Sequence, residues 1–137
     1  MSTTGLREEG HPLQLAVERV LRPVLAPRNS PCVLVAYSGG RDSSVLLHAA
    51  VSAIGAASVV AVHINHRLQQ QAGDWQTHTE NVAHELGCRY RCIEATPPEK
   101  HPSGGIELWA RSVRRSALVK LAHQVDAAAV LLAHHAD

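Results

Sequence analysis

The stretch CVLVAYSGGRDSSVLLHAA, residues 32–50, decides the fold of this chain. Its first six residues have strand character, and a Ser-Gly-Gly turn follows them directly. An amphipathic helix is then predicted to begin near Asp42. The start of a helix presents unpaired backbone N–H groups and a partial positive charge, so it favours anions. Gly39 and Gly40 carry no Cβ, which lets the backbone approach a phosphate closely. The stretch therefore predicts a phosphate-binding turn between a strand and a helix.

The polar side chains of this turn indicate which ligand it takes. Ser38, Ser43 and Ser44 add hydroxyl donors, but the carboxylate of Asp42 would repel a phosphate. Asp42 fits as the N-cap of the helix, or as a ligand of a Mg²⁺ ion that itself binds phosphates, and the two roles are compatible. Neither GxxxxGK[ST] nor GxGxxG is present, so the turn is of another kind.

The composition describes one domain with an aliphatic core. The chain has 137 residues, of which 45% are hydrophobic and only 3% aromatic, with no Phe. The net charge of +1 does not indicate that the chain as a whole binds nucleic acid. Three cysteines and no secretory signal favour a reducing compartment and free thiols. No apolar run approaches the roughly 18 residues of a membrane span. We therefore expect a cytoplasmic protein without membrane contact.

Predicted strands and helices alternate along the chain. A lead helix contains Pro23, which is expected to kink or shorten it. The strands read as nearly continuous apolar runs, which is typical of a parallel sheet covered on both faces. We predict a doubly wound α/β sheet with strands at 32–37, 58–64, 89–95 and 128–133 and helices at 42–54, 74–86 and 106–125. Residues 1–30 form a tail and lead helix, and residues 31–137 form the ligand-binding domain.

The strand order predicts where the ligand lies. If the second and third strands lie on one side of the first, and the fourth on the other, the order reverses between strands one and four. Ligands of such sheets bind at this switch point, beyond the carboxyl ends of the strands. The Ser-Gly-Gly turn would meet there the last four residues of the chain, His134, His135, Ala136 and Asp137.

These strings resemble a known family. SGGRDSS resembles the SGGxDS signature of PP-loop ATP pyrophosphatases, which cleave ATP between the α and β phosphates. AVHINHRL (61–68), GDWQTHTENVAHELG (73–87), GIELWARSVRRSAL (105–118) and the final AHHAD are similar to segments of tRNA(Ile)-lysidine synthetases. The resemblance implies a PP-loop fold and an ATP-dependent tRNA-modifying ligase. It also implies ATP and Mg²⁺ as cofactors, with lysine and tRNA(Ile) as partners. In this reaction, ATP adenylates carbon 2 of cytidine 34, and the lysine amine then displaces AMP to give lysidine.

The resemblance also implies the roles of individual residues. Pyrophosphate would be held by the turn and the start of its helix, and adenosine by the ends of strands one and two. Asp42 and Asp137 would bind the metal and act in catalysis. Arg111, as a catalytic residue, and Arg114 would face phosphates of ATP or tRNA, and Glu107 would contact lysine or the metal. The pyrophosphate set is Ser38, Gly39, Gly40, Asp42, Ser43 and Ser44, and the adenosine set is Ala36, His63 and Ile64.

Simpler interpretations exist for several of these residues. Arg111, Arg114, Arg115 and Lys120 fit equally well as the solvated face of a helix. His134 and His135 point to opposite faces of a regular strand, so both cannot easily bind one ion. We interpret Trp75 and Trp109 as helix-packing residues rather than platforms for base stacking. Cys88 and Cys92, spaced CxxxC on an expected strand, read as small apolar residues.

The sequence also departs from the family. Asn65, Arg67 and Arg115 replace residues that are common in its motifs, and the family's last motif is cut at Asp137. We therefore expect an N-terminal catalytic fragment that is inactive alone and that self-associates through an exposed sheet edge. Two alternatives stay open. One is another PP-loop enzyme, a tRNA thiolase or an amide-forming synthetase, and the other is a non-catalytic ATP-binding module.

Overall fold

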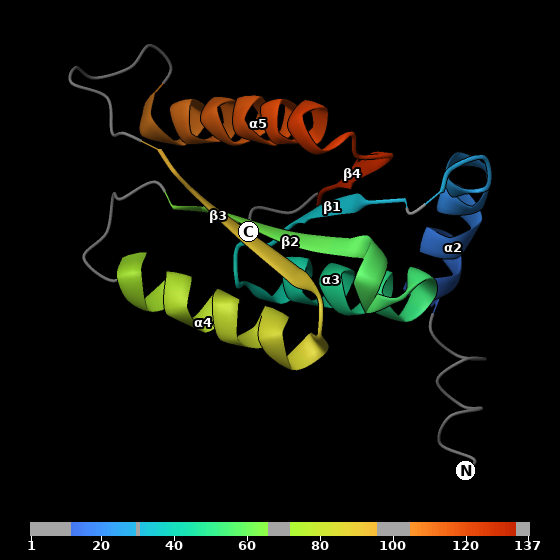
Figure 1. Cartoon of the computed structure of the whole chain (residues 1–137). Coiled ribbons are helices and arrows are strands. Elements are labelled where there is room, and N and C mark those ends of the chain that lie inside the picture. Colours follow the sequence, from blue (N-terminus) through green and yellow to red (C-terminus); the bar gives the residue numbers. More distant parts are fainter. Residues whose placement is uncertain (1–11, 30, 66–71, 96–104, 134–137) are drawn as a thin grey trace.

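A computed structural model describes residues 12–29, 31–65, 72–95 and 105–133, except for the side chains of Ala72, Gly73 and Ile106. The fold is a sheet covered by helices on both faces (Figure 1). Helices α3 and α4 cover one face, where α2 packs beside α3, and α5 covers the other face. The strands are β1 (Val33–Ala36), β2 (Val59–Asn65), β3 (Arg89–Glu94) and β4 (Ala129–Leu131). The helices are α2 (Pro12–Leu25), α3 (Arg41–Ile54), α4 (Ala72–Leu86), α5 (Gly105–Val125) and the short η1 (Ala56–Ser58).

The strand order is β3-β2-β1-β4, and every pairing is parallel. Val33 of β1 pairs with Val59 of β2 on one side and with Ala129 of β4 on the other. The predicted doubly wound sheet is therefore confirmed, with its switch point between β1 and β4.

Aliphatic side chains fill both faces of the sheet. On the α3 face, Val33 and Val35 of β1 pack with Leu47 of α3 and with Leu21 of the lead helix. On the α5 face, Leu34 packs with the inner side of α5. All four residues of β1 are buried, because this strand has a neighbour on each side and helices above and below. The lead helix α2 thus shares its core with the sheet.

The edge strand β3 differs from the prediction. Its residues are exposed or half-buried, and none is buried, whereas a continuous buried run was expected. The prediction was wrong here because β3 lies at the edge of the sheet, where one side has no neighbouring strand among the described residues. Arg89 and Arg91 pair with Val60 and Val62 of β2, whose side chains face α5. Charged side chains on an edge strand discourage pairing with another chain.

The ends of the helices follow the expected breakers with small shifts. Gly55 caps α3 at a φ of 90°, and Gly87 follows α4 at a φ of 81°. The N–H of Cys88 then bonds to the carbonyl of Ala83 at 3.1 Å, which closes the last turn of α4. Cys88 therefore precedes β3 rather than lying on it. Pro23 lies inside α2, which ends two residues later.

The three described cysteines are free, as expected. Among the helices within the described ranges, none is both long and apolar enough to cross a membrane.

Candidate functional site

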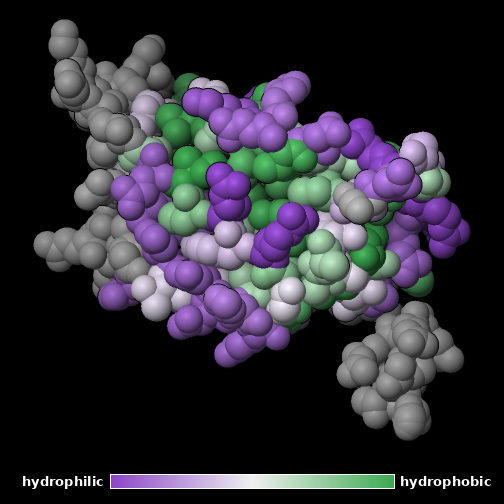
Figure 2. Space-filling view, viewed as in Figure 1, coloured by the Kyte–Doolittle hydropathy of each residue, from purple (hydrophilic) through white to green (hydrophobic). Residues whose placement is uncertain are grey.

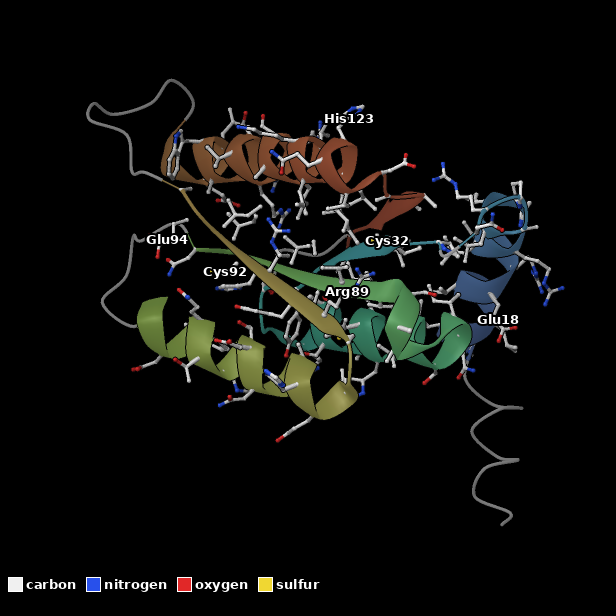
Figure 3. All side chains as sticks on the ribbon, in the orientation of Figure 1. Glu18, Cys32, Arg89, Cys92, Glu94 and His123 are labelled. Carbon is white, nitrogen blue, oxygen red and sulfur yellow. The ribbon has the colours of Figure 1, made fainter. Side chains whose placement is uncertain are left out.

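The segments that were predicted to form the binding site meet at the carboxyl ends of the strands. The loop from β1 to α3, the end of β2 and the first turns of α4 and α5 all lie at this end of the sheet, on the left in Figure 1. Figure 3 shows Glu94 at the same end, whereas Cys32 and Arg89 lie toward the opposite end. Since β1 is central, its loop leaves the sheet at the switch point between β1 and β4.

The loop after β1 is held by hydrogen bonds among its own serines. The N–H of Ser38 donates to Oγ of Ser43 at 3.1 Å, and the two hydroxyls lie 2.9 Å apart. The N–H of Gly40 donates to Oγ of Ser38 at 3.1 Å. The Ser43 and Ser44 hydroxyls reach the carbonyl of Gly40 at 3.4 and 2.6 Å. These bonds hold the loop in a defined shape, so the serine hydroxyls stabilise the loop itself.

The helix after the loop begins one residue earlier than predicted. Its N-cap is Gly40, in an extended conformation with φ −80° and ψ 178°, and no side chain caps it. The prediction of Asp42 as N-cap was therefore wrong, because Asp42 already lies within the first turn of α3. The first helical bond is made by the Ser44 N–H, which donates to the Gly40 carbonyl at 3.0 Å. The N–H groups before it have no carbonyl one turn back, so the helix start retains its preference for anions.

Gly39 is the residue of the loop that only glycine fits. Its φ is 97°, a conformation that L side chains rarely adopt. An added Cβ would lie 2.9 Å from Cε3 and Cζ3 of Trp75 and 3.1 Å from Cγ2 of Thr79. The loop therefore packs directly against α4. Sequence reasoning placed Trp75 in helix packing, but it missed that the packing partner is the loop.

At the end of β2, His63 is bound from inside the fold. Its Nδ1 lies 3.0 Å from the carbonyl oxygen of Tyr37. Because a carbonyl only accepts, Nδ1 carries the proton and donates it to this bond, and Nε2 is the unprotonated nitrogen of the neutral ring. Burial lowers the pKa of His63, and the bond to Tyr37 opposes this only in part. His63 is therefore neutral at pH 7, and its Nδ1 proton is directed to the carbonyl of Tyr37.

The three residues expected at adenosine do not share one face of the sheet. Ala36 and Ile64 are buried in the cluster that faces α5. His63 alternates with Ile64 along β2, so its side chain lies on the α3 and α4 face. All three lie at the carboxyl ends of adjacent strands β1 and β2. Their contact with adenosine stays a prediction, and any contact with all three would involve the backbone.

The charged residues expected on α5 lie mostly in solvent. Arg111 forms an ion pair with Glu107 at 3.8 Å, and their side chains are 56% and 84% exposed. Pairs of this kind, four residues apart on an exposed helix surface, contribute about 0.3–0.5 kcal/mol. Arg115 and Lys120 are exposed, while Arg114 is half-buried. This arrangement matches the solvated-face interpretation for Arg111, Arg115 and Lys120.

The structure describes only part of the expected metal site. Within the described ranges, no three His, Cys, Asp or Glu residues are grouped so that they could hold a metal ion. The half-buried Asp42 is the described carboxylate nearest in sequence to the loop. Asp137, His134, His135 and the departure at Arg67 lie outside the described residues. Mg²⁺ commonly takes one or two carboxylates together with phosphate oxygens, so Asp42 fits such an ion when a nucleotide supplies the other ligands.

A cavity of about 460 Å³ lies elsewhere, along the β3 edge. Its walls include Cys32 just before β1, Val60 near the start of β2, Arg89 at the start of β3 and Leu121 of α5. Figure 2 shows apolar side chains at the surface between α5 and the sheet, in the region of β3. None of the predicted site residues lines this cavity, and the hydrogen-bonded loop is at the other end of the strands. The candidate site is therefore the loop rather than this cavity.

The fold and the loop together define a class: a doubly wound α/β domain with a hydrogen-bonded Ser-Gly-Gly turn between its central strand and the following helix. The model of the PP-loop domain family matches residues 13–137, and the chain belongs to this family.

The chain is similar in sequence to curated proteins and in fold to a solved structure. The chain is 36% identical to the tRNA(Ile)-lysidine synthase of Burkholderia mallei over 132 residues, which are 92% of this chain and 27% of that protein. It is 44% identical to the tRNA(Ile)-lysidine synthase of Alkalilimnicola ehrlichii over 117 residues, 83% of this chain and 25% of that protein. The chain thus spans about a quarter of the length of these relatives. An NH3-dependent NAD synthetase from Campylobacter jejuni shares the fold, with a TM-score of 0.65 and 16% identity over 84% of this chain and 52% of that one.

Proposed function

We propose that this chain is the ATP-binding part of a tRNA(Ile)-lysidine synthase. In the proposed reaction, O2 of cytidine 34 attacks the α-phosphorus of ATP, the α–β phosphoanhydride bond breaks, and pyrophosphate leaves. The lysine amine then attacks carbon 2 of the adenylated cytidine, and AMP leaves as the carbon–nitrogen bond forms. The similarity to two tRNA(Ile)-lysidine synthases over more than four fifths of the chain supports this substrate pair.

The observation that carries the ATP-binding step is the preformed loop at the carboxyl end of the central strand. Its serine hydrogen bonds fix the backbone, and the start of α3 lies directly behind it. A fixed loop that presents N–H groups loses little conformational freedom when an anion binds, which favours affinity. The proposed anion is the pyrophosphate portion of ATP, held by the backbone from Ser38 to Ser44.

The other residue roles extend this proposal. Asp42 would hold Mg²⁺ together with Asp137, and the ion would offset negative charge on the leaving pyrophosphate. Ala36, His63 and Ile64 would surround adenosine at the ends of β1 and β2.

The start of α5 lies at the same end of the sheet, so its charged residues would act on the substrates. Arg111 and Arg114 would face phosphates of ATP or tRNA. Glu107 would bind the lysine amine. This requires the ion pair between Glu107 and Arg111 to break.

Calorimetric titration of the 137-residue chain with Mg–ATP tests the first step, with Mg–GTP as the control nucleotide. We expect ATP to bind selectively. Asp42→Asn should weaken Mg–ATP binding, whereas Glu85→Gln, which changes an exposed carboxylate on α4, should leave it unchanged. Equal heats for ATP and GTP, or equal affinity of both variants, would contradict the assignment of the loop and of Asp42.

The tRNA step needs a protein in which this chain is continued to the length of its relatives. We expect that protein to incorporate labelled lysine into tRNA(Ile) in the presence of ATP. ATP turnover without lysine incorporation would exclude lysidine formation and leave another PP-loop reaction in its place.

A thiolase is disfavoured by the state of the cysteines. Thiolases of this superfamily would need a reactive thiolate, and burial raises the pKa of both Cys88 and Cys92. Cys88 is buried near the start of β3, and its Sγ lies 3.7 Å from the carbonyl of Ala83. Cys92 lies further along β3 and faces α4, so the two thiols do not form a pair at the loop (Figure 3).

A further inference from the structure

Trp75 is partly exposed and also packs against the loop between β1 and α3. The residue is 41% exposed, and its ring lies against the backbone of the loop between β1 and α3 at Gly39, which we call the PP-loop (residues 37–40). It stands near the start of α4, at the carboxyl end of the sheet, and its ring also meets the ring of His78 edge-on at a centroid distance of 5.6 Å. The role proposed so far for the loop does not use this residue.

The contact with Gly39 fixes one side of the loop. The ring carbons Cε3 and Cζ3 and the methyl group of Thr79 fill the space where a Cβ on Gly39 would be. Thr79 is fully buried, so this side of the loop is closed to water below the exposed part of the indole. The loop is thus held by its own serine hydrogen bonds on one side and by the side chains of Trp75 and Thr79 on the other. These two side chains form a wall on α4 beside Gly39.

That wall is itself anchored to two strands of the sheet by residues that follow Trp75 on α4. The side chain of Asn65, at the end of β2, donates from Nδ2 to Oε1 of Gln76 at 3.1 Å. The hydroxyls of Thr79 and Tyr90 lie 2.8 Å apart and join α4 to β3. Both anchors are within four residues of Trp75 on the same helix. The indole therefore rests on a segment that cannot shift without breaking hydrogen bonds to two strands.

We propose that Trp75 is a positioning residue, which holds the PP-loop in its binding shape before the nucleotide arrives. The proposal deepens the function above, since it rests on the PP-loop as the ATP site. The ring limits the motion of Gly39, which as a glycine at positive φ has more conformational freedom than the serines of the loop. A loop ordered in advance binds more tightly, because less freedom is lost on binding.

Three variants and two measurements test this role. Trp75→Ala removes the ring, Trp75→Phe keeps an aromatic wall, and Trp109→Phe serves as the matched control on α5. The first measurement is amide hydrogen exchange of residues 38–41 in the protein without nucleotide. The second is the affinity for Mg–ATP by calorimetry, with the melting temperature recorded for each variant. We expect Trp75→Ala to speed exchange and to weaken ATP binding, each on the order of tenfold. Trp75→Phe should restore most of both, and Trp109→Phe should change neither.

Each result bears on the proposal. Unchanged exchange in Trp75→Ala overturns it, and if ATP affinity falls without faster exchange, Trp75 contacts the nucleotide directly instead of positioning the loop. If the wild-type chain is folded but binds no ATP, the proposed function fails, while faster exchange in Trp75→Ala still supports the hold on the loop.

If Trp75→Ala does not fold, Trp75→Leu and Trp75→Phe decide between them. Residues 38–41 must exchange faster in the Leu variant than in the Phe variant, and equal exchange in the two overturns the proposal.

Discussion

Replacement of Ser43 by alanine tests whether the serine hydrogen bonds hold the PP-loop. Ser43 is 2% exposed, and its hydroxyl is the acceptor for the N–H of Ser38 at 3.1 Å and a partner of the Ser38 hydroxyl at 2.9 Å. Truncation leaves a part-buried N–H without that acceptor. An unsatisfied buried donor costs about 1–3 kcal/mol. We therefore expect the free energy of unfolding to fall by this amount.

Ser44→Ala is the matched control. The Ser44 hydroxyl donates to the Gly40 carbonyl at 2.6 Å, but that carbonyl also accepts the N–H of Ser44 at 3.0 Å and keeps this bond in the variant. Alanine also has the higher helix propensity, by up to about 0.5 kcal/mol. We expect Ser44→Ala to change the free energy of unfolding by less than about 0.5 kcal/mol.

Urea denaturation followed by circular dichroism measures both variants under one set of conditions. The difference between them is the quantity of interest, since it removes most errors of extrapolation. Equal stability of the two variants would refute the reasoning, because the Ser38 N–H would then be satisfied in some other way. We also expect Ser43→Ala to bind Mg–ATP about tenfold more weakly, because ordering the loop on binding would then cost about 1.4 kcal/mol.

Three further predictions concern the framework around the loop. Leu47→Ala, at a fully buried position of α3, should cost about 2–5 kcal/mol in urea denaturation, whereas Val45→Ala on the exposed side of that helix should cost less than about 0.5 kcal/mol. Similar values for both would place Leu47 outside the core. Burial lowers the pKa of His63 below 6.5, so protonation in the unfolded state removes stability as the pH falls from about 6.5 toward the lower folded pKa. His63→Asn should flatten this decline in thermal melts, and the exposed His48→Asn should not, so parallel curves for wild type and His63→Asn would contradict the assignment. Tyr90→Phe should cost about 0.5–1.5 kcal/mol by removing the hydroxyl that joins β3 to α4, and an unchanged unfolding midpoint would show that this bond adds nothing.

The doubly wound parallel sheet could be predicted because the pattern around β1 is unambiguous. Residues 32–37 are apolar without interruption, as a strand with neighbours on both sides requires, and the turn residues follow at once. Parallel connections through helices then leave few arrangements of the remaining strands. The position of the loop at the switch point was predicted on the condition that strands two and three lie on one side of strand one and strand four on the other. The observed order β3-β2-β1-β4 meets this condition.

Other features depend on distances that the sequence does not contain. Asp42 was expected as N-cap because Asp favours that position, but Gly40 can start the helix without a side-chain cap. The exposure of β3 follows from its place at the edge, which its own residues do not specify. The contact of Trp75 with Gly39 depends on the position of α4 along the sheet. The hydrogen bonds that Asn65 and Tyr90 make with α4 fix this position. The proposed role of Trp75 in limiting the motion of Gly39 was therefore not predictable from local patterns.

The pairing of β1 with β4 has a consequence for how the chain reaches its fold during synthesis. Residues 33 and 129 are partners in the sheet, so nearly the whole described chain must leave the ribosome before β1 gains its second neighbour. Until then β1, the most apolar strand, has an open edge beside the PP-loop. Pairings between residues so distant in sequence form slowly, because a long loop must close first. The emerging chain is therefore most exposed to misassociation at the strand that carries its binding loop.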